Sequence, residues 1–293
     1  MQSQELKHKI DSIRMWQRGG ERAPHKPLLI LYALSSLAKG APRLVAYEEV
    51  VDDLKQLLKE FGPYRQTYSP SYPFVRLCND GIWEITGLEL LKTNKDWTDR
   101  ELISNQTNGG FTEAVYNLLK NNQALIKEIA SQLLNLNFPD TIHEDILDQI
   151  GLGLDPIGKV QRSSDFRLRV LNAYEYRCAV CGFNVRLGET LVALEAAHIK
   201  WHQAGGPDSE VNGIALCSMH HKLFDRGVFT LTDNLTFQVA EQAHGTCGME
   251  EWLLKYHGQQ IRKPQRPDYF PKDSFIDWHV REVFRGPARY ENT

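Results

Sequence analysis

Apolar residues recur at helical spacing through most of the first half of the chain. Leu6, Ile10 and Ile13 are three or four positions apart and predict a helix within residues 1–22. Prolines and glycines bound the later apolar stretches, and we expect further helices at residues 28–38, 48–60, 111–120, 122–135 and 140–150. The first half of the chain is therefore predicted to be mainly helical.

One segment of the first half has the pattern of strands. Residues 73–77 are predicted to form a strand, Asn79-Asp80-Gly81 is a strong turn signal, and the apolar run 82–85 is the expected return strand. The two strands would form a β-hairpin. Together with the helices, this pattern predicts a first domain that covers residues 1–152, a usual domain size.

The second half predicts a different arrangement. Its elements are expected in the order helix, strand, strand, helix, at residues 164–174, 192–199, 213–216 and 217–224. The glycine-rich run that starts at Gly151 predicts a linker over residues 153–163, which leaves 164–293 for a second domain. The whole chain is thus predicted to be α+β, with a helical first domain and a ββα second domain.

Cysteine and histidine residues of the second domain occur in two closely spaced pairs. Cys178 and Cys181 form a C-x2-C pair, and Cys217 and His220 form a C-x2-H pair. Four such ligands in two pairs are typical of a tetrahedral structural Zn²⁺ site. A purely structural zinc ribbon would explain these pairs, but it would not explain the residues that lie between and after them.

Three of those residues have the chemistry that phosphodiester hydrolysis requires. His198 ends an apolar strand and is a candidate general base. The amide of Asn212 is a candidate to orient His198 by bonding to its ring or its backbone. His221 follows His220, and adjacent helical residues point about 100° apart, so His220 can face the zinc while His221 faces the substrate. We expect the zinc site to hold the three residues together.

These motifs occur in a fixed order. C-x2-C, A-H-I, N-G-I-x-L-C-x2-H-H and F-D-x-G follow one another over residues 165–235, and this stretch resembles the HNH endonuclease family. The resemblance implies that His198 is the general base, that Asn212 positions it and that His221 binds a catalytic divalent metal, Mg²⁺ or Mn²⁺.

The chain departs from many HNH sites at one position. The acidic metal ligand that often precedes the base is replaced by Ala197. Glu195, two residues earlier, is a candidate substitute; alternatively, the metal has fewer protein ligands. Asp225 is either a further helper at this site or a residue that caps or pairs within its own helix, and the second interpretation is favoured.

Segments of the first domain carry a second resemblance. Residues 23–29, 71–77 and 79–84 together resemble the DNA sulfur-binding domains that precede HNH modules in McrA-like, phosphorothioate-dependent restriction endonucleases, over about residues 5–152. The resemblance implies a partner, phosphorothioated double-stranded DNA, in which sulfur replaces a non-bridging phosphate oxygen. Candidate DNA- and sulfur-binding residues are Tyr72, Pro73, His25, Lys26 and Arg76.

Composition limits these interpretations only slightly. The net charge of −3 gives no global nucleic-acid signature, so DNA binding would depend on local basic residues. The chain lacks a membrane-length apolar run and a secretory pattern, which predicts a cytoplasmic protein. Two alternatives stay open: an HNH nuclease that reads another DNA modification or plain sequence, and a non-catalytic DNA-binding protein with a degenerate HNH fold. A homodimer is expected if both strands are cut.

Overall fold

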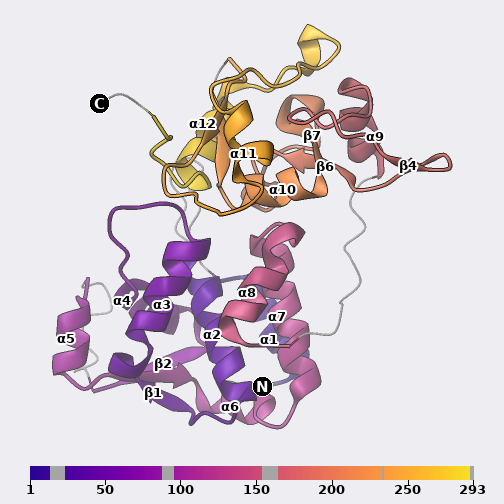
Figure 1. The fold of residues 1–293 in the computed structure, drawn as a ribbon. Helices are drawn as coiled ribbons and strands as arrows, with labels where there is room; N and C mark the ends of the chain where they lie inside the picture. The colour runs from indigo at the N-terminus through magenta and orange to yellow at the C-terminus, as the bar shows by residue number, and fades with distance from the viewer. Residues whose placement is uncertain (14–23, 88–95, 154–163, 233, 291–293) are drawn as a thin grey trace. The chain divides into compact units, whose positions relative to one another are not determined.

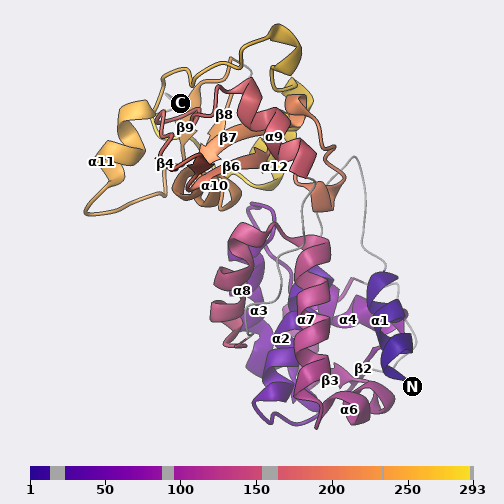
Figure 2. The same cartoon turned by 90° about the vertical axis from the view of Figure 1, so that its right-hand side faces the viewer.

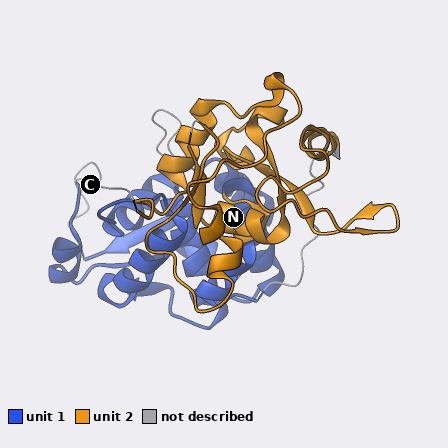
Figure 3. Ribbon diagram, turned by 45° about the horizontal axis from the view of Figure 1, so that its top comes forward, with its two compact units in different colours: residues 1–137, 143–158 blue, residues 138–142, 159–293 orange. Residues whose placement is uncertain are grey.

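The computed structural model describes residues 1–13, 24–87, 96–153, 164–232 and 234–290. The chain divides into two compact units (Figure 3), unit 1 with residues 1–137 and 143–158 and unit 2 with residues 138–142 and 159–293. Residues 138–142 precede the linker that the sequence predicts, yet they pack with unit 2. Among the described helices, none is long and apolar enough to cross a membrane.

Unit 1 is a helical assembly with one small sheet (Figure 1). Its helices are α1 (Ser3–Asp11), α2 (His25–Ala38), α3 (Tyr47–Phe61), α4 (Ser71–Arg76), α5 (Asp99–Ser104), α6 (Glu113–Leu119), α7 (Gln123–Asn137) and α8 (His143–Ile150). Its strands, β1 (Leu44–Ala46), β2 (Trp83–Thr86) and β3 (Asn108–Phe111), pair antiparallel in the order β1-β3-β2. Helix α2 is buried along most of its length because α3, α4, α7 and α8 pack around it.

The predicted α+β class is confirmed, but the strand expected at residues 73–77 is wrong. These residues belong to α4 and to the 3-10 helix η1 (Leu77–Asp80), and Gly81 ends η1 with φ 70° instead of turning a hairpin. Pro73 lies in the first turn of α4, where a missing N–H costs no helical hydrogen bond. The helix predicted over residues 1–22 is α1, and the part from residue 14 onward lies outside the described residues.

Phe74 is the residue that fixes α4 on unit 1. Its ring contacts Tyr47 edge-on, with 4.8 Å between the ring centroids, and Trp83 with 5.6 Å. A Cβ atom at Gly109 would lie 2.4 Å from the Phe74 ring, so strand β3 can pass beneath it only with glycine at that position. The ring therefore sets the position of the exposed side chains of α4, Tyr72 among them.

Unit 2 is centred on a two-stranded antiparallel sheet (Figure 2). Its elements are η2 (Asp140–Ile142), α9 (Ser164–Ala173), β4 (Arg186–Leu187), β5 (Thr190–Leu191), β6 (Leu194–His198), β7 (Gly213–Cys217), α10 (Ser218–Asp225), β8 (Phe229–Leu231), β9 (Phe237–Val239), α11 (Met249–Trp252) and α12 (Asp273–Glu282). The predicted order of helix, strand, strand and helix is therefore present as α9, β6, β7 and α10.

Helices α9 and α10 cover opposite faces of the β6–β7 sheet. Successive side chains of a strand point to opposite faces, so His198 shares a face with Leu194 and Ala196. Phe166 of α9 stacks on the His198 ring, which identifies this as the α9 face. A Cβ atom at Gly213, the cross-strand partner of His198, would lie 2.4 Å from a methyl carbon of Val170. Glycine there lets α9 pack closely against the end of the sheet.

Candidate active site and DNA-recognition site

Four potential metal ligands converge where α10 begins. Cys178 and Cys181 lie after α9, Cys217 ends β7, and His220 lies in the first turn of α10. Their ligand atoms all lie within 4.8 Å of one another, with 3.7 Å between Cys178 Sγ and His220 Nδ1 and 4.0 Å between the sulfurs of Cys181 and Cys217. A tetrahedral ion with metal–sulfur bonds of about 2.3 Å separates its ligand atoms by about 3.6–3.8 Å. The four residues therefore form a site that fits such an ion.

Neighbouring groups prepare these ligands for a metal. The Nε2 atom of His220 donates a hydrogen bond to the Trp252 carbonyl over 2.9 Å, which directs Nδ1 toward the cysteines. Hydrogen bonds from Cys181 and Cys217 lower the pKa of the Cys178 thiol and favour its thiolate, whereas contacts with Cys178 and Cys181 raise the pKa of Cys217. The sequence predicted the four ligands but not the contribution of Trp252.

Contacts with Phe166 and Asp208 help to hold His198 at the end of β6. Its ring stacks on Phe166 with 4.0 Å between centroids, and its Nε2 atom donates to Asp208 Oδ1 over 2.8 Å. A carboxylate only accepts hydrogen bonds, so a neutral His198 ring carries its proton on Nε2 and its lone pair on Nδ1. The contacts thus select both the orientation and the tautomer of the candidate base.

Asn212 closes the loop that follows His198. Its Oδ1 atom accepts from the Lys200 amide over 2.8 Å, and its Nδ2 atom donates to the carbonyls of Lys200 and Pro207, both over 3.0 Å. The expected bond from this amide to the ring or backbone of His198 is therefore wrong. The loop that Asn212 closes carries Asp208, the partner of the His198 ring.

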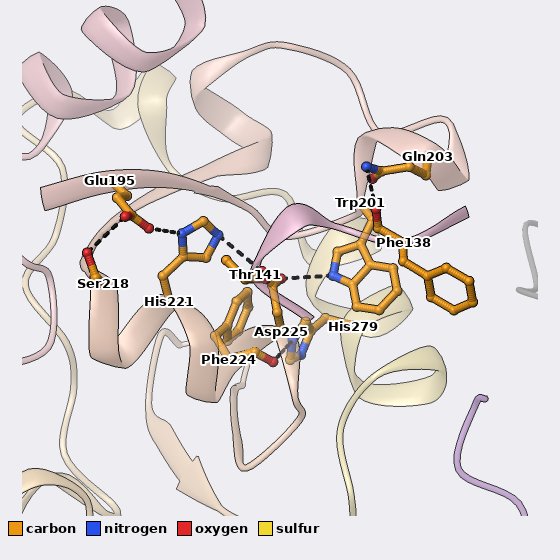
Figure 4. Close-up of polar contacts among 10 residues, drawn as sticks. All are labelled: Phe138, Thr141, Glu195, Trp201, Gln203, Ser218, His221, Phe224, Asp225 and His279. Atoms are coloured by element: carbon orange, nitrogen blue, oxygen red, sulfur yellow. Dashed lines mark hydrogen bonds and ion pairs between the residues drawn. The ribbon is translucent and has the colours of Figure 1, made fainter. Parts of the chain in front are cut away.

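His221 lies between two carboxylates on the α10 face of the sheet (Figure 4). Its Nδ1 atom is 2.7 Å from Glu195 Oε2, and its Nε2 atom is 3.2 Å from Asp225 Oδ2. The Ser218 hydroxyl donates to the other Glu195 oxygen over 2.8 Å. Burial lowers the pKa of His221, but Asp225 and Glu195 outweigh burial and raise it to about 9. Asp225 thus pairs within its own helix, with His221 four residues earlier, and that partner is itself a candidate metal ligand.

The two histidines occupy different surroundings. His198 contacts α9 and the loop after β6, whereas His221 and Glu195 face α10 on the other side of the sheet. Across the described residues, the cysteine–histidine cluster is the one group of three or more His, Cys, Asp or Glu ligands close enough to hold a metal. The expectation that the zinc site would bring His198, Asn212 and His221 into one group is therefore not met by direct contacts.

The candidate recognition residues of unit 1 lie on two helices. Tyr72, Pro73 and Arg76 belong to α4; the Tyr72 side chain is exposed, Pro73 is buried, and the Arg76 guanidinium lies 5.1 Å from the centre of the Tyr72 ring. His25 and Lys26 begin α2, which packs against α4. The structure thus places all five residues on two packed helices.

Two of the basic side chains have acidic partners that the sequence did not indicate. Arg76 pairs with Asp96. Lys26 Nζ lies 2.5 Å from Asp80 Oδ2, and the two side chains are only 13% and 3% exposed. Lys26 therefore links the start of α2 to η1, and removal of either side chain would take this partner from a largely buried charge.

Two family models match the chain and together cover most of it. Residues 3–155 match the ScoMcrA-like DNA sulfur-binding domain, and residues 178–232 match the HNH endonuclease family HNH_2. The chain belongs to the ScoMcrA-like family of DNA sulfur-binding domains. It continues into an HNH endonuclease domain, and the predicted family, the enzyme class and the function as a modification-dependent restriction endonuclease are confirmed.

Parts of the chain are similar to several solved structures. The sulfur binding domain of SprMcrA complexed with phosphorothioated DNA is 22% identical over 52% of this chain and 95% of that chain, with a TM-score of 0.45. The corresponding ScoMcrA complex is 24% identical over 50% of this chain and 95% of that chain, with a TM-score of 0.43. The modification dependent TagI restriction endonuclease is 25% identical over 44% and 40%, with a TM-score of 0.30. No curated protein matches the chain.

The HNH domain contains site residues that sequence motifs alone did not reveal. Asp208 lies in an irregular loop with no spacing rule to mark it, and Trp201 and Thr141 reach Asp225 from outside α10. A signal did exist for Asp225, since a carboxylate four residues after a histidine in a helix is placed to pair with it. The other contacts depend on loop paths that local sequence patterns do not encode.

Replacing Asn212 with Ala should loosen the loop after His198 and reduce DNA cleavage. The change leaves the polar groups of Lys200 and Pro207 without their buried partner, at a cost of about 1–3 kcal/mol. Amide hydrogen exchange of residues 199–212 should rise, and the cleavage rate should fall with it. Ser209→Ala is the matched control, because among the described residues the buried Ser209 hydroxyl has no hydrogen-bond partner. Equal exchange in the two variants would contradict the role of Asn212.

Proposed function

We propose that the sulfur-binding domain recognises phosphorothioated double-stranded DNA and that the HNH domain hydrolyses phosphodiester bonds nearby, with His198 as base. The observation that carries this proposal is the presence in one chain of a sulfur-binding domain match over residues 3–155 and an HNH match over 178–232 that contains an assembled ligand cluster. The first domain would select the DNA and the second would cut it.

Sulfur recognition would use the exposed side of α4. Sulfur is larger and less strongly hydrated than oxygen, so an apolar surface favours it. An oxygen placed there would lose its hydrogen bonds to water and gain none from the protein. Tyr72 offers an exposed ring, and the buried Pro73, the next residue of α4, would support that ring from below. Arg76, which lies over the Tyr72 ring and would exchange Asp96 for the DNA, and His25 at the start of α2 would hold the phosphate charge. Lys26, shielded in its pair with Asp80, would contribute by fixing the start of α2.

Hydrolysis would begin with a proton transfer to His198. A water molecule attacks phosphorus and gives its proton to the Nδ1 atom, because Asp208 holds the other ring proton on Nε2. The bond from phosphorus to the leaving oxygen then breaks, and that oxygen takes up a proton from a solvent water molecule, while the imidazolium of His198 later returns its proton to solvent. Asp208 also stabilises the imidazolium that forms, as its carboxylate is 2.8 Å away.

Glu195 and His221 are the residues that would hold the catalytic divalent metal, Mg²⁺ or Mn²⁺. A carboxylate oxygen and the Nδ1 atom of His221 lie 2.7 Å apart, and water would complete the coordination of an ion that has few protein ligands. When bound, such an ion stabilises negative charge on the phosphate and on the leaving oxygen. Ala197, on the same face as Glu195, contributes no ligand.

We also propose that the cluster of Cys178, Cys181, Cys217 and His220 binds a structural Zn²⁺. Thiolate and imidazole ligands in tetrahedral array suit zinc better than Mg²⁺ or Mn²⁺, which prefer oxygen. A double-strand break would use two copies of the HNH domain, one for each strand, so a homodimer on DNA is part of the proposal.

The full chain should bind and cut a phosphorothioated duplex at least about tenfold better than the unmodified duplex of the same sequence, a difference of about 1.4 kcal/mol. The comparison measures Kd by fluorescence anisotropy without divalent metal and the cleavage rate with Mg²⁺ or Mn²⁺. Tyr72→Ala should abolish the discrimination, and Tyr64→Ala, which removes another exposed tyrosine ring, should preserve it. Equal binding of both duplexes by the unaltered protein would refute sulfur recognition.

Replacing His198 with Ala should lower the cleavage rate by about 10²–10⁴-fold, the usual contribution of a positioned general base. Binding of the modified duplex should not change, because the substitution leaves α2 and α4 intact. His202→Ala is the control, since its ring lies 5.9 Å from that of His198 and has no assigned role in proton transfer. If His198→Ala cuts at the normal rate, another group must act as the base.

Replacement of His220 and of His221 with Ala should impair different properties of the protein, metal binding and folding for His220 and DNA cleavage for His221. Loss of His220 removes a ligand from the cluster, and structural zinc contributes about 10–16 kcal/mol to folding in zinc-finger peptides. His220→Ala should therefore lose zinc and unfold the HNH domain, whereas His221→Ala should keep zinc and lose cleavage. Metal analysis by mass spectrometry, together with circular dichroism, measures both; zinc retained by a folded His220→Ala protein would contradict the assignment.

A further inference from the structure

A five-residue segment of the first half of the chain packs with the nuclease unit. Residues 138–142 belong to unit 2, although the residues on both sides of them belong to unit 1. The segment includes η2, which packs against α10. Its sequence lies within the sulfur-binding family match, 3–155, and outside the HNH match, 178–232.

Hydrogen bonds connect this segment to other residues of the nuclease unit (Figure 4). The Thr141 hydroxyl donates a hydrogen bond to Asp225 Oδ2, and the Phe138 carbonyl accepts one from Gln203 Nε2 over 2.9 Å. The side chain of Asp225 is only 1% exposed. A carboxylate so deeply buried depends on donors from the protein, because water is not there to solvate it.

Both carboxylate oxygens of Asp225 contact donors from other parts of unit 2. Oδ1 accepts from Trp201 Nε1 over 3.0 Å, whereas Oδ2 accepts from Thr141 and pairs with His221 Nε2 over 3.2 Å. Thr141 and His221 therefore meet at one oxygen atom. The position of the Thr141 hydroxyl thus helps to set the position of the carboxylate, and the carboxylate sets the rotation of the His221 ring.

The rotation of that ring decides where its other nitrogen points. With Nε2 held by Asp225, Nδ1 faces Glu195 at 2.7 Å. Histidines that bind metals generally donate their other ring N–H to a carboxylate or carbonyl, and loss of such a partner typically costs about 10–100-fold in metal affinity or activity.

We propose that Thr141 is a positioning residue for His221, acting through Asp225, so that the segment of residues 138–142 completes the HNH site. The proposal rests on the function proposed above, in which His221 holds the catalytic metal. A shortened protein that contains only the HNH match would lack Thr141. Its buried Asp225 carboxylate would therefore lose a hydrogen-bond donor.

The test compares Thr141→Val with Thr141→Ser in the full chain. Valine keeps the shape of threonine and removes the hydroxyl, whereas serine keeps the hydroxyl. Thr141→Val should cut phosphorothioated DNA about 10–100-fold more slowly or need about 10–100-fold more Mn²⁺ for half-maximal rate. Thr141→Ser should stay within about threefold of the unaltered protein, and Kd for the modified duplex should not change in either variant.

A second measurement reports the ring itself. In protein labelled with ¹⁵N-histidine, the ring signals of His221 should shift in Thr141→Val and return toward normal in Thr141→Ser. Thr107→Val is the control for loss of a buried hydroxyl, because within the described chain the Thr107 hydroxyl has no partner.

The two measurements separate the possible failures. Unchanged His221 signals in Thr141→Val overturn the proposal, whether or not the protein cuts DNA. Normal cleavage by Thr141→Val, in a preparation where the unaltered protein is active, overturns its role in catalysis. If the unaltered protein binds but does not cut modified DNA, the proposed function fails, while the ring signals still decide whether Thr141 positions His221.

Discussion

The HNH unit depends on the convergence of four ligand atoms at the start of α10. The sheet beneath them has only two strands, and a two-stranded sheet is at best marginally stable in water without further packing. The cluster joins the turn after α9, the end of β7 and the first turn of α10, so it fixes where α10 begins. Because His221 follows the ligand His220 directly, the same constraint fixes where His221 lies relative to Glu195.

Two kinds of contact then divide the sheet into two functional faces. On one face, close packing fixes the side chains, because the absence of a Cβ atom at Gly213 lets α9 approach the sheet and Phe166 stacks on His198. On the other face, buried polar groups are decisive, because Asp225 accepts hydrogen bonds from residues of separate elements. The candidate base His198 and the candidate metal ligand Glu195 both lie on β6, and the two histidines have different carboxylate partners, Asp208 for His198 and Glu195 with Asp225 for His221.

In the sulfur-binding domain, aromatic packing and a shielded ion pair hold the helices that carry the candidate recognition residues. Its candidate recognition residues lie on helices that are held from behind, α4 by the buried ring of Phe74 and α2 by the shielded pair of Lys26 and Asp80. The side chains exposed on α4 are thus supported by a rigid core. For a site that must distinguish sulfur from oxygen, such rigidity matters, because the two atoms differ modestly in size and mainly in hydration.

The sequence by itself determined the features that depend on local spacing. The periodic apolar positions determined most of the helices, and the pairs Cys178/Cys181 and Cys217/His220 determined the ligand cluster, since residues three apart in a turn or a helix are near neighbours. Ordered motifs also identified both domains. Tertiary structure decided the rest: Pro73 to Leu77 became helix because the first turn of α4 tolerates proline and Phe74 finds a buried site. It also brought Asp208 to His198 and Thr141 to Asp225, since such contacts depend on the paths of loops and on burial, which no local pattern specifies.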